Sequence, residues 1–336
     1  MPDATRVRLI RKPDEKLTEA DFGVEKIRLK TPSDAEVLVR VRYISLDPYL
    51  APMMRSWQGP DPAWEQGIIV GRMVGRVLES RDPAFSRGDW VAGPGHWQSH
   101  ELCHGSNLRR IDVEEGVPAP AFLGVMGSSG LTAWVGINRV LRVSAGETLT
   151  ISSAAGIVGG IAGQLAKRLG ARVVGIAGGP AKCASVVSEL GFDACIDYRN
   201  PEFWSELKKA VGPGIDAHYE NVGAPILDPV LSLMRERGRI ALCGLIAHYL
   251  DDETICLKNF RKLLTSGLSI QGFRVFDYQK ETDTAHGELR AALKSGDLAL
   301  RETLTKGLEN APRAYLDMLA GKGMGKYLIE LDDDPG

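Results

Sequence analysis

The chain has 336 residues, of which 44% are hydrophobic and 25% are charged. This composition is typical of a folded globular protein and excludes a disordered, collagen-like or coiled-coil chain. A length of about 100–200 residues per domain makes two domains the natural expectation. The net charge of −2 excludes the strongly basic surface of a general nucleic-acid binder, so we expect no nucleic-acid partner.

The cysteines and the amino-terminal sequence indicate a reducing compartment. Five cysteines occur, and no two of them lie two to four residues apart: Cys103, Cys183, Cys195, Cys243 and Cys256. This spacing fits neither a disulfide framework nor a zinc knuckle. The segment Met1–Arg6 has no apolar run, so we expect no signal peptide. We therefore expect a soluble, cytoplasmic protein without a membrane partner.

The first third of the chain has the pattern of short strands. Val37–Tyr43 alternates between apolar and polar residues, as a half-buried strand does, and Ile68–Leu78 and Trp90–Ala92 are further strand candidates. Turns rich in Gly, Pro and Asp separate these segments. Short strands with frequent turns predict a compact, barrel-like β domain.

The pattern changes near residues 124–136, and from Gly146 onward short apolar strands alternate with helices. The predicted strands are Thr148–Ser152, Arg172–Ala177, Cys195–Tyr198, Asp216–Tyr219, Arg239–Cys243 and Ser269–Phe273, and the helices between them include one ending near Leu169, Lys182–Leu190 and Pro201–Val211. This alternation predicts an α/β fold with a doubly wound parallel sheet. A final helix, Ala311–Ala320, and a strand, Lys326–Leu331, are expected to return to the first domain.

A glycine-rich turn follows the first strand of this region. Ala154, Gly156 and Gly159 form A-x-G-x-x-G, which differs from the dinucleotide-binding fingerprint at one position. The small residues permit a tight turn, close approach of the backbone to a pyrophosphate, and close packing of helix on sheet. The helix N-terminus then offers N–H groups to the anion. The alternative is a tight strand-to-helix turn that binds nothing.

The residues after the second predicted strand favour NADPH over NADH. NAD sites usually carry an acidic residue about 20 positions beyond the glycines, which binds the ribose 2′-hydroxyl. The stretch Val174–Lys182 has no acidic residue, and Lys182 can offer a 2′-phosphate a charge-assisted contact. A solvated lysine in the first turn of a helix is the alternative. The missing acid and the present base together predict NADP(H) as the cofactor.

Six motifs, in order along nearly the whole chain, resemble one family: Leu46-Asp-Pro-Tyr49, Gly130-Leu-Thr-Ala133, Ala154-Ala-Gly-Ile-Val-Gly159, Glu220-Asn-Val-Gly223, Cys243-Gly-Leu-Ile246 and Ile270-Gln-Gly-Phe273. The sequence resembles the zinc-independent medium-chain dehydrogenase/reductases, in the group of leukotriene/prostaglandin reductases, alkenal double-bond reductases and bacterial curcumin reductases. The resemblance implies a GroES-like β-barrel domain for substrate and catalysis (residues 1–125 and 310–336), a Rossmann domain that binds NADPH (126–309), and a cleft between them.

The resemblance also implies a set of cofactor contacts. These are Gly156, Ile157 and Val158 along the pyrophosphate, Lys182 and Tyr198 at the adenosine end, Asn221 on the nicotinamide side, Cys243, Gly244 and Tyr249 from a lining segment, and Phe273 and Val275 beside the nicotinamide ring. Asn221 follows a parallel strand, where α/β folds bind ligands. From the residues alone, an ordinary turn residue is the better interpretation of Asn221, and the two tyrosines could equally be packing residues.

A histidine-rich stretch between residues 96 and 104 contains possible metal ligands. Zinc-dependent members of the superfamily carry a Gly-His-Glu motif, and the corresponding stretch here resembles Gly71-Arg72-Met73, without that metal-binding pair. His96, His100, Cys103 and His104 form the cluster. If these lay on one strand, the histidines would share a face but stand about 13 Å apart, too far for one ion. We therefore expect no metal.

Without zinc, an alcohol or a simple ketone is harder to polarise, and a conjugated enone or enal is a better hydride acceptor. The site then needs a hydrogen-bond donor at the carbonyl oxygen and a proton source for the α-carbon. Tyr49, the tyrosine of the family's Asp-Pro-Tyr motif, is the candidate donor, with ordinary packing as its alternative. Arg55, Trp57 and Trp97 are candidates for shaping the mouth of the substrate pocket. Three positions depart from the family pattern: Thr265 replaces a tyrosine, Gly323 replaces an asparagine, and Tyr49-Leu-Ala51 replaces Tyr-Met-Arg.

Three functions stay open at this point. The first is an NADPH-dependent enone or enal double-bond reductase, and the second is a quinone reductase of the same superfamily. The third is a dinucleotide-binding protein without catalysis. The family is commonly dimeric, and the strand near Ser269–Phe273 is expected at the edge of the sheet, where it can pair with a second copy.

Overall fold

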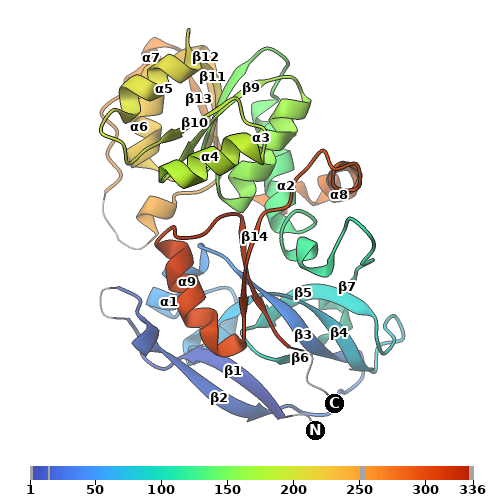
Figure 1. Cartoon of the computed structure of the whole chain (residues 1–336). Helices are drawn as coiled ribbons and strands as arrows, with labels where there is room; N and C mark the ends of the chain where they lie inside the picture. The colour runs from blue at the N-terminus through green and yellow to red at the C-terminus, as the bar shows by residue number, and fades with distance from the viewer. Residues whose placement is uncertain (1–2, 14–15, 250–253, 333–336) are drawn as a thin grey trace. The chain divides into compact units, whose positions relative to one another are not determined.

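The computed structural model describes residues 3–13, 16–249 and 254–332 of the chain. The chain divides into two compact units: unit 1 comprises Met1–Leu123 and Glu302–Gly336, and unit 2 comprises Gly124–Arg301. Each unit has its own main sheet (Figure 1). None of the described helices is long and apolar enough to cross a membrane.

Unit 1 is built on a seven-stranded mixed sheet with the order β14-β15-β3-β4-β5-β7, in which β6 also pairs with β3. A separate antiparallel pair, β1 and β2, completes the strands. The bounds are β1 Asp3–Leu9, β2 Phe22–Arg28, β3 Glu36–Leu46, β4 Val70–Ser80, β5 Trp90–His96, β6 His100–His104, β7 Arg109–Arg110, β14 Glu302–Lys306 and β15 Lys326–Glu330. Two α-helices belong to this unit, α1 (Leu50–Ser56) and α9 (Ala311–Leu319).

The core of unit 1 explains why its strands form where they do. Val37, Val39 and Val41, at alternate positions on β3, are at most 1% exposed. They pack in one cluster with large aromatic residues such as Trp64 and Trp97. The period of two in the sequence therefore corresponds to a buried row on the sheet.

Unit 2 contains a parallel six-stranded sheet with the order β10-β9-β8-β11-β12-β13 and helices on both faces (Figure 1). Its strands are β8 Thr148–Ser152, β9 Arg172–Ala177, β10 Ala194–Asp197, β11 Ile215–Glu220, β12 Met234–Leu242 and β13 Ser269–Gly272. Its α-helices are α2 Ser128–Val135, α3 Ile157–Arg168, α4 Pro180–Ser188, α5 Phe203–Val211, α6 Ala224–Leu233, α7 Lys262–Thr265 and α8 Thr282–Lys294. The prediction of a doubly wound parallel sheet is confirmed.

Glycine brings α3 close to its neighbours in unit 2. A Cβ atom at Gly163 would lie 1.8 Å from the ring of Phe192, and a Cβ atom at Gly159 would lie 2.4 Å from the carbonyl oxygen of Ser153. Larger residues at these two positions would push α3 away from Ser153 in the turn and from the ring of Phe192. Gly159, which belongs to the dinucleotide-binding fingerprint, therefore also has a packing role.

The structure differs from the sequence pattern at several elements. β1 and β2 are not predicted, because charged residues such as Arg6 and Lys26 alternate along them and lower their apolar content. β12 begins at Met234, before the predicted Arg239, because its start pairs with Ile215 of β11. The chain returns to unit 1 at Glu302, before the expected residue 310, because β14 pairs in parallel with β15.

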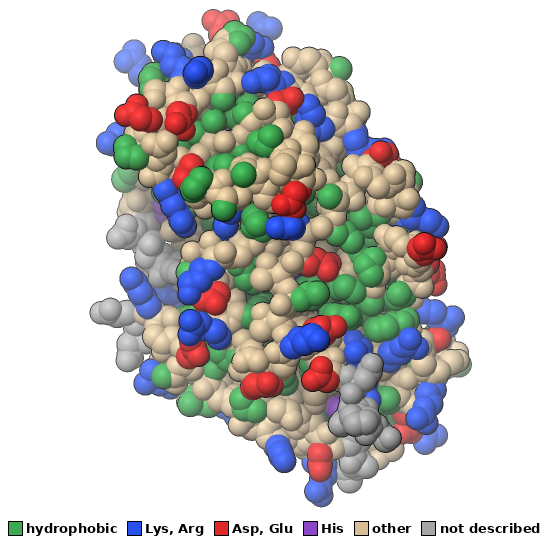
Figure 2. Space-filling view, viewed as in Figure 1, with side chains coloured by type: hydrophobic (Ala, Val, Ile, Leu, Met, Phe, Trp, Pro, Cys, Tyr) green, Lys and Arg blue, Asp and Glu red, His purple; other side chains and the backbone are tan. Residues whose placement is uncertain are grey.

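The surface charge agrees with the balanced composition. Figure 2 shows Lys and Arg side chains interspersed with Asp and Glu over the face in view, and no single basic patch dominates that face.

Candidate cofactor-binding and catalytic site

The glycine-rich turn joins β8 to α3 at the carboxyl end of the parallel sheet. Gly156 is the N-cap of α3, and Ile157 and Val158 are its first two residues; all three are partly exposed. A Cβ atom on Gly156 would lie 2.9 Å from the Ser153 Oγ atom. The helix therefore starts with accessible backbone N–H groups that can bind an anion.

The alanine that departs from the fingerprint is explained by the neighbouring strand. Ala154 is fully buried, and a Cβ atom on Gly175 of β9 would lie 2.8 Å from the Ala154 Cβ atom. Because β9 has a glycine at this point, the turn accommodates alanine in place of the first glycine. Ala154 and Gly175 therefore form a matched packing pair, and the alanine does not alter the rest of the glycine-rich turn.

Two cations converge beside the turn between β9 and α4. Gly179 has φ 100° and precedes Pro180, the first residue of α4. Burial, and then the charge of Arg199, lower the pKa of Lys182. A Cβ atom on Gly178 would lie 3.1 Å from the Arg199 Nε atom and 2.9 Å from the Tyr198 ring. Like charges held together in this way favour an anion between or beside them.

Arg199 is a candidate residue that the sequence analysis missed. Its guanidinium lies 5.7 Å from the centre of the Tyr198 ring, and Tyr198 is 44% exposed. The signal was available, because a basic residue directly follows the tyrosine after a strand that neighbours β9. The neighbouring Asp197 reaches the same turn, but its Oδ1 atom accepts hydrogen bonds from the N–H groups of Gly179 (2.8 Å) and Arg199 (3.0 Å).

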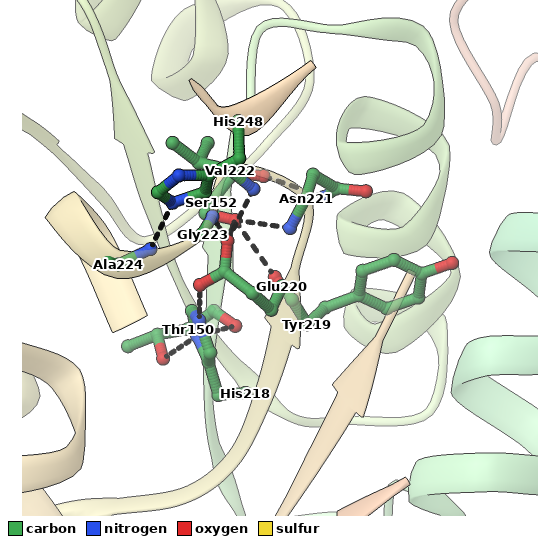
Figure 3. A network of polar contacts seen from close by, with 10 residues as sticks. All are labelled: Thr150, Ser152, His218, Tyr219, Glu220, Asn221, Val222, Gly223, Ala224 and His248. Carbon is green, nitrogen blue, oxygen red and sulfur yellow. Dashed lines mark hydrogen bonds and ion pairs between the residues drawn. The ribbon is translucent and has the colours of Figure 1, made fainter. Parts of the chain in front are cut away.

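Asn221 lies at the end of β11, in a dense polar network (Figure 3). Its backbone N–H donates to the Ser152 Oγ atom (2.7 Å) and its Nδ2 atom donates to the Ser152 carbonyl oxygen (2.8 Å). Ser152 in turn donates to the Glu220 carboxylate (2.8 Å), and Glu220 contacts the His218 Nε2 atom (2.7 Å). The carboxamide oxygen of Asn221 points away from this network (Figure 3).

The segment from Cys243 to Tyr249 is fastened to the same turn. The N–H groups of Cys243 and Gly244 both donate to the Glu220 carbonyl oxygen, at 2.9 Å and 3.1 Å. The Tyr249 hydroxyl accepts from the Leu245 N–H (3.3 Å), and burial raises the pKa of Tyr249. Burial also raises the pKa of the Cys243 thiol to about 11. The Cys243 thiol therefore stays protonated and is not a nucleophile at neutral pH.

Phe273 and Val275 lie just after β13. The Phe273 ring meets the Tyr219 ring edge to face at 6.3 Å, and Val275 begins a short 3-10 helix. Both residues are partly exposed. The Tyr219 hydroxyl donates to the Thr132 carbonyl oxygen (2.9 Å), so this aromatic pair is attached to α2.

In unit 1, Tyr49 is held beside a buried ion pair. Tyr49 is 45% exposed and directly precedes α1. Two residues earlier, Asp47 pairs with the Lys326 ammonium group, which is 2% exposed. Desolvation by the surrounding protein, and then the Asp47 charge, raise the pKa of Tyr49 to about 12. The phenol therefore keeps its proton at neutral pH and can donate a hydrogen bond.

The three candidates for the pocket mouth have different surroundings. Arg55 on α1 and Trp57 directly after it are partly buried. Trp97 is 0% exposed and packs between Phe22, at 6.1 Å between ring centres, and Tyr315, at 5.5 Å. Trp97 is therefore a core residue and does not line a pocket mouth.

The histidine-rich stretch is divided between two strands. His96 ends β5, whereas His100, Cys103 and His104 lie on β6. The His96 Nδ1 atom contacts Glu101 at 3.0 Å, and the His104 Nδ1 atom contacts the Ser106 hydroxyl at 2.8 Å. Among residues 3–13, 16–249 and 254–332, no three His, Cys, Asp or Glu side chains form a group that could hold a metal ion.

The structure also shows the surroundings of Thr265 and Gly323, two positions that depart from the family pattern. Thr265 is the last residue of α7 and is exposed. The Gly323 N–H donates to the Tyr327 hydroxyl, and a Cβ atom on Gly323 would lie 2.2 Å from that hydroxyl oxygen. An asparagine at position 323 would require Tyr327 to move, so the glycine fits the tyrosine four residues later.

Comparison with known proteins decides the family. One family model, described as the N-terminal domain of oxidoreductase, matches residues 5–111, and a second, described as zinc-binding dehydrogenase, matches residues 158–291. The NADPH-dependent curcumin reductase of Escherichia coli (strain K12) is 36% identical over 94% of this chain and 93% of its own length. The chain belongs to the medium-chain dehydrogenase/reductase family. A tobacco (Nicotiana tabacum) relative, 2-alkenal reductase (NADP(+)-dependent), is 35% identical over 93% of this chain and 92% of its own length.

A solved family structure has the same fold. The crystal structure of CurA in complex with NADPH, from Vibrio vulnificus, superposes with a TM-score of 0.90. It is 32% identical and covers 98% of this chain and all of its own. The description of the second family model names zinc, but the donor sets in the described part of this chain do not fit that ion.

Proposed function

We propose that this chain is an NADPH-dependent reductase of the carbon–carbon double bond in α,β-unsaturated ketones or aldehydes. Alkenals, 15-oxoprostaglandin-like enones and curcumin-like enones are the substrate class. The observation that carries the proposal is the glycine-rich turn after β8 together with Lys182 and Arg199, which follow the neighbouring strands β9 and β10. Relatives of the chain are named NADPH-dependent curcumin reductase and NADP(+)-dependent 2-alkenal reductase.

The residues of unit 2 fit NADP(H). The N-terminus of α3, at Gly156, Ile157 and Val158, would hold the pyrophosphate. Lys182 and Arg199 would bind the 2′-phosphate, with the exposed Tyr198 ring beside the adenosine. The nicotinamide half would meet Asn221, the segment that begins at Cys243 and Gly244 and ends at Tyr249, and the side chains of Phe273 and Val275.

When bound, NADPH would supply a hydride for the β-carbon of the substrate, the π electrons would move to the carbonyl oxygen, and a proton taken up at the α-carbon would complete the saturated product. Tyr49 would donate a hydrogen bond to that oxygen and stabilise the charge that develops there. A phenol with a pKa of about 12 holds its proton at neutral pH, as this role requires. Arg55 and Trp57 would border the substrate.

We also propose that the protein is a cytoplasmic homodimer. β13 is an edge strand of the unit 2 sheet, and large apolar side chains near it are exposed, with Phe260 at 60%, Leu264 at 86% and Phe276 at 66%. An unpaired strand edge next to exposed apolar residues favours pairing with a second copy. Leu264→Glu should convert the dimer to a monomer in sedimentation velocity, and a monomeric wild-type protein would contradict the proposal.

A matched substrate panel tests the activity. The purified protein would be given NADPH, a chelator and one of three acceptors: a conjugated enone, its saturated ketone, or a quinone. We expect NADPH consumption with the enone, at least a hundredfold above that with the saturated ketone. Faster turnover of the quinone would favour a quinone reductase, and saturable NADPH binding without turnover would indicate a non-catalytic protein.

A further inference from the structure

The polar network behind Asn221 contains two buried ionisable residues to which the proposed chemistry assigns no role. His218 and Glu220 occupy alternate positions on β11, so their side chains share one face of the sheet, and both are 0% exposed. We propose that His218 and Glu220 are positioning residues that fix the Asn221 carboxamide for the nicotinamide half of the cofactor. This inference rests on the proposed function, because it takes NADPH as the ligand.

Every oxygen of the Glu220 carboxylate has a defined donor. The Oε1 atom accepts from the Ser152 hydroxyl (2.8 Å) and from the N–H groups of Val222 and Gly223 (2.9 Å for Gly223). The Oε2 atom accepts from the His218 Nε2–H group (2.7 Å), since an ionised carboxylate has no proton to donate. Burial alone would raise the pKa of Glu220, but His218 and the two N–H groups hold it below its usual value.

His218 is itself fixed by the central strand. Its Nδ1 atom contacts the Thr150 hydroxyl at 2.8 Å and the Thr150 carbonyl oxygen at 3.2 Å. The imidazole therefore bridges β8 and β11, and it presents Nε2 to Glu220 in one orientation. Removing it would leave the Glu220 Oε2 atom without a donor in a fully buried place, where an unsatisfied charged group is costly.

The link from this pair to Asn221 passes through Ser152. The Ser152 Oγ atom donates to Glu220 and accepts the backbone N–H of Asn221 (2.7 Å), while the Ser152 carbonyl oxygen accepts the Asn221 Nδ2–H group (2.8 Å). The amide nitrogen of Asn221 thus faces the protein. Its carbonyl oxygen, with no hydrogen bond to the described residues, is left pointing outward as an acceptor (Figure 3).

An acceptor in a fixed place suits a ligand group that carries N–H or O–H donors. The nicotinamide half of NADPH offers both, in its carboxamide and its ribose hydroxyls. The adenosine half binds at Lys182 and Arg199, next to different strands of the sheet. A positioning role therefore predicts that the two halves of the cofactor respond differently when the network is broken.

Calorimetric titration with two ligands makes this distinction. NADPH probes the whole cofactor site, and 2′,5′-ADP probes the adenosine half alone. We expect His218→Leu to weaken NADPH at least tenfold while changing 2′,5′-ADP affinity less than twofold. His218→Gln, which keeps a nitrogen donor for Glu220, should restore most of the NADPH affinity. Equal loss for both ligands, or no loss for either, would overturn the positioning role.

A matched control lies at the other end of the same strand. Asp216 on β11 pairs with Arg235 (2.8 Å), so Asp216→Asn removes an ion pair from β11 without touching the network. It should lower stability and leave the ratio of the two affinities unchanged; a shift as large as that of His218→Leu would contradict a specific role for His218.

If His218→Leu does not fold, a variant of Ser152 tests the same inference. Ser152→Ala removes the hydroxyl link and should reproduce the selective loss of NADPH affinity. In an Asn221→Ala background, Ser152→Ala should have less than a twofold further effect, because the carboxamide it orients is gone. Independent, additive losses would overturn the inference. A wild-type protein that binds neither ligand would instead refute the proposed NADPH function.

Discussion

Each unit contains a buried carboxylate next to a candidate functional residue, but the two carboxylates find their partners in different ways. In unit 2, Glu220 pairs with His218, two positions earlier on the same strand. In unit 1, Asp47 pairs with Lys326, which comes from the other end of the chain. Glu220 directly precedes Asn221, and Asp47 lies two positions before Tyr49. Each of these two candidate residues thus lies close in sequence to a carboxylate that is buried within its own unit.

The difference predicts how each unit tolerates the loss of a partner of its carboxylate. Glu220 has three further donors, the Ser152 hydroxyl and two N–H groups, so its charge is satisfied mainly by local contacts. Asp47 depends on the Ser45 hydroxyl and on Lys326. Loss of one partner should therefore be more damaging in unit 1 than in unit 2.

The largest expected effect is on stability. Lys326→Met should destabilise the protein by about 3–5 kcal/mol, because it leaves the Asp47 carboxylate buried without its cation. His218→Leu should cost about 1–3 kcal/mol, since Glu220 keeps its other donors. Urea unfolding monitored by tryptophan fluorescence measures both. The double variant Lys326→Met/Asp47→Asn should recover part of the loss, and an equal cost for the two single variants would remove the contrast between the units.

The next effect concerns the choice of cofactor. Lys182→Glu and Arg199→Gln should each weaken NADPH by about 10–100-fold, the equivalent of one charge-assisted contact, and should leave NADH affinity within twofold. Fluorescence titration with both cofactors measures this. If the variants lost affinity for NADPH and NADH equally, neither Lys182 nor Arg199 would recognise the 2′-phosphate.

Tyr49→Phe isolates the donor in unit 1. The substitution should lower the rate of enone reduction at least tenfold and leave NADPH affinity unchanged, because phenylalanine keeps the ring and lacks the hydroxyl. Steady-state kinetics with a separate NADPH titration would show it. An unaltered rate would exclude the Tyr49 hydroxyl as a needed donor.

The smallest expected effect is that of pH on the rate of enone reduction: the ionisation of Tyr49 should hardly change this rate. A raised pKa means that the protonated phenol of Tyr49 persists to higher pH than in an ordinary tyrosine. The rate should therefore fall by less than twofold from this group up to about pH 10, where a tyrosine with the usual pKa would be half ionised. A half-maximal loss near pH 10 in wild type that is missing in Tyr49→Phe would contradict the shift.

Much of unit 2 follows from the sequence because its signals are local. The parallel strands, the glycine-rich turn and the absence of an acid before Lys182 can all be read within short windows. Arg199 was missed because it comes from the next strand over, although its position after Tyr198 was visible. The alternation along β11 indicates which residues share a face of the sheet, but it does not show what their side chains contact. No role for His218 could therefore be predicted from it.

Unit 1 was harder to predict for a physical reason. The pairing of Asp47 with Lys326 depends on the chain returning to β3 after an entire second unit, and no local pattern encodes that contact. Trp97 looked like a surface aromatic among histidines and proved to be a core residue between Phe22 and Tyr315.

The central claim is that hydride is delivered to the β-carbon of a conjugated substrate. NADPH deuterated at the transferred position, given with an enone to the purified protein, tests it directly. The account predicts a saturated ketone with deuterium on the β-carbon, identified by NMR. An allylic alcohol with deuterium on the carbinol carbon would show carbonyl reduction instead and would contradict the account.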